Sequence, residues 1–357
     1  MPNNTQERSF YPDFLRVIAI FEVILLHLIA SKFGTLNPES YEWQVLNFYD
    51  GLSRWPVPIF IMVSGMFLLD FRRYSENVTE NFHRIAKKNI LRMVIALVFW
   101  STFYLYFEMF LSGQFDPSPI KLGSFLFRNV KYHLWFLYLI IGLYIMTPFL
   151  QLLVKNLSKK DFELLLIILA ISSCGYDLIN VCLDFFVNRT LFIRSEVPEL
   201  GGYVIYFLAG YYFAHFEISK KTRIIFYILA IVSFLFSICS NSAFAIISGK
   251  AKEFIFQCKL LNVMFPAFGI FIFVKNSFTN LKDNSKFKNI ITKLSGLSFG
   301  IYLIHVAVLD VIVKKLQITT LCFNPIISVP LLNIAIFLIS TILAWIISKI
   351  PILRKVI

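Results

Sequence analysis

The chain has 357 residues, of which 58% are hydrophobic and only 15% charged, and its mean hydropathy is +0.72. This composition excludes a soluble globular protein and leaves no stretch for a separate soluble domain. The formal net charge of +13 does not indicate nucleic-acid binding, because the basic residues gather in alternate loops between apolar segments. We therefore expect one all-α integral membrane domain over residues 1–357.

Apolar runs long enough to cross about 30 Å of hydrocarbon as helices recur along the whole sequence. They predict ten spans, near residues 12–31, 52–70, 90–111, 133–154, 162–180, 201–216, 224–246, 257–274, 296–313 and 326–348. With both termini in the cytoplasm, the inner segments hold 20 of the 34 lysines and arginines and the outer loops hold 12. This positive-inside distribution orients the chain, with anionic lipid headgroups as the expected partners of the basic residues.

The first span, YPDFLRVIAIFEVILLHLIA, carries an arginine and a histidine on one face. Arg16 and His27 are eleven residues apart, so at about 100° per residue they fall within roughly 20° of each other, about three turns along the helix. A cationic group that faces lipid costs at least about 2.5–3.5 kcal/mol. We therefore expect this face to border a protein-lined cavity.

Each residue of this pair has a functional and a structural interpretation. His27 could act as a general base on an alcohol, or it could serve only to form a hydrogen bond to a neighbouring helix. Arg16, near the cytoplasmic end, suits a phosphate, pyrophosphate or carboxylate, and alternatively an arginine that reaches the headgroups while paired with Asp13. Glu22 lies between them on another side of the helix and is expected to pair with a different helix.

The second span begins SRWPVPIFIMVSGMFLL. Arg54 is expected at its outer edge, and the small residues Ser64 and Gly65 allow close approach of another helix. The stretch 32–51 before this span is expected to be an outer loop. The inner loop 71–89 after it is long enough for an interfacial helix.

A basic cluster follows that inner loop at the predicted cytoplasmic mouth. It consists of Arg84, Lys87, Lys88 and Arg92. Such a cluster is typical of topology and lipid contact, and it also suits phosphate binding.

Two later spans carry further polar groups. His133 and Trp135 open the fourth span at the outer interface, where aromatic residues are expected in any case. His305 lies inside the ninth span with Tyr302 one turn before it.

The five cysteines show no CxxC pairing and are expected to be packing residues, and the eight-residue spacing of Cys174 and Cys182 does not establish a disulfide. No Walker A, HExxH or GxSxG motif is present, so ATP hydrolysis, metalloprotease and hydrolase classes have no support, and we expect no metal.

Four stretches together resemble the membrane-bound acyltransferase-3 family over nearly the whole chain. The matching residues are Asp13, Arg16 and His27; Arg54, Pro58, Phe60, Ser64 and Gly65; His133, Trp135, Tyr138, Tyr144 and Pro148; and Ser298, Gly300, Tyr302 and His305. The chain is most similar to the single-domain O-acetyltransferases of bacterial glycans, such as that of enterobacterial common antigen. It departs from the family at Asn89 and Ala96, where many relatives have an arginine and a proline.

The resemblance implies an O-acetyltransferase of the bacterial cytoplasmic membrane. Such an enzyme moves an acyl group from cytoplasmic acyl-CoA, here with acetyl-CoA as co-substrate, to a sugar hydroxyl of a lipid-linked or surface polysaccharide. His27 would be the general base or a transient acyl carrier, Arg16 would hold the acyl-CoA, and Lys88 and Arg92 would attract its phosphates. The expected substrate pocket consists of Arg54, His133, Trp135, Tyr302 and His305.

Two other classes fit parts of the pattern. In an exporter or flippase of a glycan or lipid-linked intermediate, Arg16 would bind a phosphate and His27 would relay protons. A cell-envelope sensor or scaffold would have no task for the buried ionisable residues. The acceptor sugar, the hydroxyl modified, the choice between acetyl and succinyl, and the oligomeric state stay open.

Overall fold

The computed structural model describes residues 9–113, 130–175, 177–179, 181, 183, 200–278 and 286–357, and the regular structure among them is entirely helical. The α-helices are α1 (Tyr11–Phe33), α2 (Tyr41–Leu52), α3 (Pro56–Leu68), α4 (Val78–Ile85), α5 (Leu91–Ser112), α6 (Trp135–Asn156), α7 (Lys159–Leu169), α9 (Leu200–His215), α10 (Lys220–Ser248), α11 (Leu261–Phe278), α12 (Lys286–Asp310) and α13 (Pro325–Lys349). Three short segments form π-helical turns, η2 (Ala86–Ile90), η5 (Ala170–Gly175) and η6 (Val311–Lys315). The 3₁₀ turns are η1 (Phe71–Arg73), η4 (Tyr132–Leu134) and η7 (Leu353–Val356).

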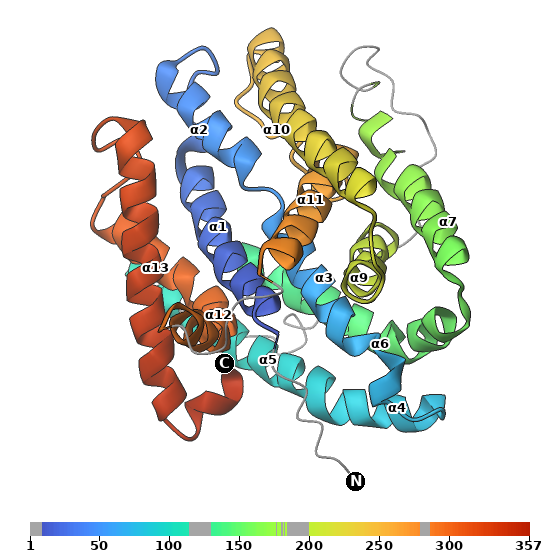
Figure 1. Cartoon of the computed structure of the whole chain (residues 1–357). Helices are drawn as coiled ribbons and strands as arrows, with labels where there is room; N and C mark the ends of the chain where they lie inside the picture. The colour runs from blue at the N-terminus through green and yellow to red at the C-terminus, as the bar shows by residue number, and fades with distance from the viewer. Residues whose placement is uncertain are drawn as a thin grey trace.

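The prediction of a polytopic all-helical membrane protein is confirmed. Within the described ranges, nine helical stretches are long and apolar enough to cross a membrane. They correspond to nine of the ten predicted spans, and the tenth, near 201–216, is α9, which has 16 residues and is shorter than the others. The start of α1 and the end of α13 lie toward the same end of the bundle (Figure 1).

The expectation of an outer loop over 32–51 was wrong in its second half, where α2 forms. Ser40 caps this helix by accepting a hydrogen bond from the backbone N–H of Trp43, at 3.2 Å. Two of its polar residues, Asn47 and Asp50, are buried. Asn47 accepts from Asn241 at 2.8 Å and donates to the carbonyl of Ile238 at 3.0 Å. These hydrogen bonds allow polar side chains to be buried in a segment that its hydropathy predicts to be a loop.

The inner loop 71–89 contains the expected interfacial helix, α4. Asn77 caps it by accepting from the backbone N–H groups of Thr79 and Glu80. The π-helical turn η2 then joins α4 to α5, so that the two helices run on from one another along one end of the bundle (Figure 1). Such turns are frequent at functional sites, and this one carries Lys88 and Asn89 toward the cytoplasmic mouth expected from the sequence.

Helices α3 and α9 touch backbone to backbone. A Cβ atom at Gly65 would lie 1.9 Å from the carbonyl oxygen of Phe207, and one at Gly210 would lie 1.9 Å from that of Met62. Only glycine fits at both positions. The expectation that Gly65 allows close helix approach is therefore confirmed, and the contact fixes α3 as one wall of the interior.

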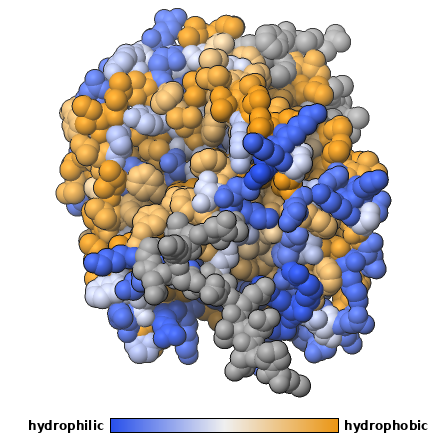
Figure 2. Space-filling model, in the orientation of Figure 1, coloured by the Kyte–Doolittle hydropathy of each residue, from blue (hydrophilic) through white to orange (hydrophobic). Residues whose placement is uncertain are grey.

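The outer surfaces of the bundle are apolar. Ile231 in α10, Leu164 in α7 and Ile342 in α13 are all more than half exposed. Figure 2 shows hydrophobic side chains over much of the visible face, with hydrophilic ones along its lower edge, on the right-hand side and at the top left. Large exposed aliphatic side chains on long helices are what a lipid-facing surface presents.

The described cysteines, Cys174, Cys239, Cys258 and Cys322, are free thiols. Cys182, the other member of the spacing noted above, lies outside the described residues. Cys174 is buried and packs within the core, as expected of a small apolar residue.

Candidate active site

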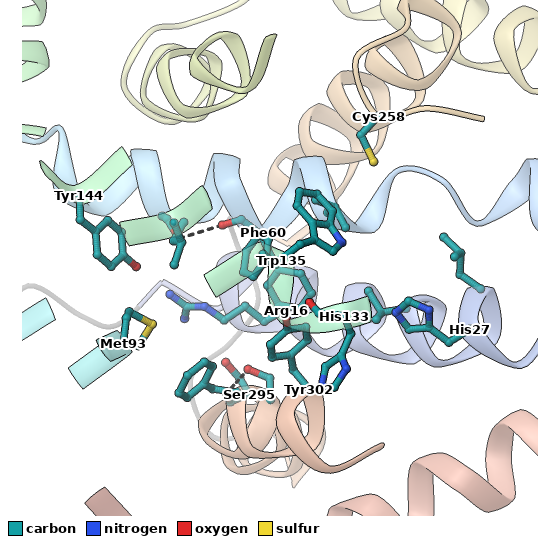
Figure 3. A pocket seen from close by; sticks show the side chains of 18 of the residues that line it. Arg16, His27, Phe60, Met93, His133, Trp135, Tyr144, Cys258, Ser295 and Tyr302 are labelled. Carbon is teal, nitrogen blue, oxygen red and sulfur yellow. Dashed lines mark hydrogen bonds between the residues drawn. The ribbon is translucent and has the colours of Figure 1, made fainter. Parts of the chain in front are cut away.

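A cavity of about 440 Å³ lies between α1, α3, α6 and α12, with the first turn of α5 at one end. The residues that line it include seven of those singled out in the sequence: Arg16, His27, Arg54, Arg92, His133, Trp135 and Tyr302. Figure 3 shows Arg16 and His27 along one helix, with Ser295 and Tyr302 on the neighbouring one. The prediction that one face of the first span borders a cavity is confirmed in its geometry.

Arg16 combines both environments considered for it. Its guanidinium lies 3.3 Å from the carboxylate of Asp13, as the structural interpretation expects, and it also lines the cavity. Asp13 is buried and accepts a second hydrogen bond from the hydroxyl of Ser295 at 2.7 Å. The Arg16 guanidinium further lies over the ring of Phe67, with 5.3 Å to the centroid. These contacts hold a cation at the cavity wall with 29% of its side chain still exposed.

A second hollow, the vestibule, continues from the Arg16 end. Its volume is about 760 Å³, and Arg16, Ser64 and Tyr144 line both hollows, so the two are adjacent. Figure 3 places Tyr144 toward the guanidinium end of Arg16. Arg16 therefore lies between the vestibule and the cavity.

The vestibule wall carries cations that were not singled out from the sequence. Arg72 and Arg73 both donate to the carboxylate of Asp70, at 2.7 and 2.9 Å, and His215 lies 3.7 Å from it. Burial alone would raise the pKa of Asp70, but the hydrogen bond from Arg72 and the charges of Arg72, His215 and Arg73 lower it below its ordinary value. One ionised carboxylate therefore anchors two half-exposed arginines beside the opening.

The opposite end of the cavity is built from aromatic and imidazole rings. The His27 ring lies between Tyr132, with centroids 4.9 Å apart, and His305, with centroids 5.3 Å apart and planes 24° apart. His133 packs against His305 at 5.5 Å, and its backbone carbonyl accepts a hydrogen bond from the Tyr302 hydroxyl. Among the described residues His27 makes no hydrogen bond, and its side chain lines the cavity.

Arg54 lies on the cavity wall at the break between α2 and α3. It is ion-paired with Asp50 and, at 3.0 Å, with Glu253, and its guanidinium lies 4.8 Å from the centroid of the Phe256 ring. Nearby, Ser53 donates to Glu22 at 2.6 Å, so Glu22 pairs with another segment as expected. The positive charge of Arg54 is balanced before any ligand arrives.

A family model described as an acyltransferase domain matches residues 9–349. The chain belongs to the acyltransferase-3 family. No curated protein and no solved structure matches it. The family and the apolar helical bundle together identify a multi-pass membrane acyltransferase.

The two basic residues expected to attract the donor phosphates, Lys88 and Arg92, lie in different surroundings in the structure. Arg92 lines the cavity, donates to the carbonyl of Ile357 at 2.7 Å and lies over the ring of Phe299. Lys88 is exposed on η2 and lines neither the cavity nor the vestibule, so its part in attracting a donor stays a prediction. Asn89, one of the departures from the family, does line the vestibule.

The other departure and the remaining pocket candidate are both buried in the acyltransferase. Ala96 lies in α5 and is fully buried in the core. His305 does not line the cavity, but it contacts both His27 and His133, which do. The part of the chain that the structure describes contains no group of three histidine, cysteine or carboxylate side chains placed to hold a metal.

Proposed function

We propose that this membrane acyltransferase moves an acetyl group from cytoplasmic acetyl-CoA to a sugar hydroxyl of a lipid-linked or cell-surface polysaccharide in the bacterial cytoplasmic membrane. The observation that carries the proposal is the pair of adjacent hollows that share Arg16, one with the arginines of the vestibule on its wall and the other with His27. A polyanionic donor suits the first end and proton transfer suits the second.

The two ends are separated by a distance that suits a long donor arm. Eleven residues of α-helix rise about 16 Å between Arg16 and His27, which is about half of a 30 Å hydrocarbon layer. Phosphates held at the vestibule would leave an extended thioester arm to reach inward along α1. The acyl group would then meet its acceptor at the His27 end without the phosphates entering the membrane.

The proposed reaction needs one base, and it needs no energy source other than the thioester of the donor. The acceptor oxygen attacks the acyl carbonyl carbon while its proton passes to a ring nitrogen of His27, and the carbon–sulfur bond breaks. The CoA thiolate then takes the proton from the His27 imidazolium, which leaves an O-acetyl ester and free CoA thiol. In the alternative role His27 itself carries the acyl group for one step.

The test is mass spectrometry of surface polysaccharide from cells that carry the wild-type gene, a deletion or the His27→Ala variant. We expect a mass increment of one acetyl group in the wild type alone. His83→Ala is the matched control, because His83 is exposed on α4 and lines neither hollow; this variant should keep the increment. The modified sugar would also show whether the acceptor resembles enterobacterial common antigen.

Two results would contradict the proposal. Unmodified polysaccharide in all strains, with an altered amount at the surface, would favour an exporter or flippase. An increment of one succinyl group would keep the reaction class and correct the donor.

A further inference from the structure

His305 presents a buried lone pair that nothing in the described structure binds. Its Nδ1 lies 2.7 Å from the carbonyl oxygen of Tyr302 and 3.2 Å from that of Ile301. A carbonyl oxygen only accepts, so Nδ1 carries the hydrogen, and Nε2 of the neutral ring is an acceptor. This Nε2 is buried and has no hydrogen-bond partner among the described residues. Buried polar atoms normally have one.

Only the rings packed around His305 can reach this atom, because His305 is 0% exposed and does not line the cavity. The Tyr302 hydroxyl is already bonded to the His133 carbonyl. His133 also packs against His305, with centroids 5.5 Å apart, and its two ring nitrogens are likewise buried without a hydrogen bond among the described residues. His27 is the nearest of the three rings to His305, with centroids 5.3 Å apart, and it lines the cavity. We therefore take His27 as the donor.

The separation of the two rings fits a hydrogen bond between them. Their centroids are 5.3 Å apart. A ring nitrogen lies less than one C–N bond length, about 1.3 Å, from its centroid, which leaves room for an N–H···N bond of about 2.9 Å. Rotation of the His27 ring about its Cβ–Cγ bond keeps the centroid nearly in place while it moves the ring nitrogens.

We propose that His305 is the positioning residue of His27: its Nε2 accepts the N–H of His27 and so holds the other His27 nitrogen free of hydrogen and facing the cavity. The inference rests on the proposed transfer reaction. It assigns to a neutral imidazole the task that a carboxylate performs in many catalytic triads, which is to fix the tautomer of the base and steady its imidazolium.

A neutral partner suits this depth in the membrane, because it adds no buried charge. The carboxylates of the surrounding elements are already held elsewhere. Asp50 and Glu253 pair with Arg54, and Asp310 pairs with Lys131, at 2.5 Å, and with Lys314, at 3.2 Å. During transfer the His27 nitrogen facing the cavity takes the acceptor's proton and returns it to the thiolate, while the N–H bonded to His305 stays in place.

The test compares His305→Gln with His305→Met in membrane vesicles supplied with radiolabelled acetyl-CoA. Both side chains lose the Nδ1 donor and have similar length, but only the glutamine offers a good acceptor oxygen near the place of Nε2. We expect kcat for incorporation into the vesicle glycan to be about 10- to 100-fold lower in the methionine variant than in the glutamine variant. The KM for acetyl-CoA should be the same in both, since His305 is outside the donor route.

His305→Asn is the reverse of the glutamine variant, since it restores a donor near Nδ1 and removes the acceptor at Nε2. If His305 served only to tie α12 to its own backbone, the asparagine variant would be the active one and the glutamine variant the inactive one. That order, or equal kcat for glutamine and methionine, would overturn the inference.

The failure of this inference is distinguishable from that of the proposed function. If wild-type vesicles incorporate no label, the transfer reaction itself is wrong. If they do, and His27→Ala abolishes incorporation while His305→Met keeps the wild-type kcat, the reaction stands and the role of His305 does not.

Discussion

The two ends of the site differ in the groups that they present: the vestibule beside Arg16, called here the inner end, presents arginines, and the His27 end of the cavity, called the outer end, presents imidazole rings. At the inner end, Arg72 and Arg73 are half-exposed in a vestibule of about 760 Å³ and share the carboxylate of Asp70. At the outer end, His27 and His305 lie ring against ring. Under the proposed function, the donor phosphates bind at the first end and the proton is transferred at the second, about three helical turns along α1 from Arg16. Changes at the first end should therefore affect donor affinity, and changes at the second should affect turnover.

The largest effect should follow from His27→Ala. Removing a positioned general base costs about 10²–10⁴-fold in rate, so kcat should fall by that much while the KM for acetyl-CoA stays near the wild-type value. Initial rates of label transfer in vesicles, measured over a range of acetyl-CoA concentrations, give both constants. A raised KM with unchanged kcat would contradict the assignment of turnover to the His27 end and of donor affinity to the vestibule end.

Arg16→Met should act mainly on the donor. Hydrogen bonds to charged groups contribute about 1.5–3 kcal/mol, so the KM for acetyl-CoA should rise by about 10- to 100-fold, and the same vesicle assay measures it. Arg16→Lys is the matched control, because it keeps the charge near Asp13 and should recover part of the affinity. If the methionine variant bound donor normally, Arg16 would serve only its ion pair with Asp13.

Changing the vestibule arginines should have a smaller effect. Their side chains are 61% and 50% exposed, and exposed ion pairs contribute about 0.2–1 kcal/mol. Arg72→Gln and Arg73→Gln should each raise the KM for acetyl-CoA by about 2- to 5-fold at low salt, and less at high salt because of screening. Arg223→Gln changes a partly buried arginine on α10 that donates to Asn276 and lines neither hollow, and it should leave the KM unchanged at both ionic strengths.

The smallest effect concerns the carboxylate beneath those arginines. Because the pKa of Asp70 is lower in the folded protein than its ordinary value, its ionised form stabilises the fold above that value, and this contribution is lost as pH falls through the folded pKa. Below about pH 4, Asp70→Asn should make the unfolding temperature of purified protein less sensitive to pH than in the wild type. Equal pH dependence in both would show that the ion cluster does not stabilise the fold.

The sequence predicts those parts of the site that depend on one helix. The 3.6-residue period places Arg16 and His27 on one face, and the structure has both on the cavity wall. The apolar runs likewise locate the spans. In contrast, α2 was missed because Asn47 and Asp50 make it look like a loop, although their partners on other segments allow burial.

The missed parts of the site depend on contacts between distant segments. His215 lies more than 140 residues from Arg72 in the sequence, yet both line the vestibule. His305 was expected in the pocket itself, but the turn of α12 places it behind the wall, against His27. Lys88 is one residue from Asn89, which does reach the vestibule, and no periodicity of the cluster distinguishes the two.

The glycine contact between α3 and α9 has a consequence for membrane permeability. An enzyme with a wet interior must not conduct protons between the two compartments, and a seam between helices is a route for a file of water. At Gly65 and Gly210 the two backbones touch directly, so no side-chain gap exists there. We expect Gly210→Ala to force the helices apart and to make vesicles that contain the protein leak protons, which a pH-sensitive dye in their lumen would report.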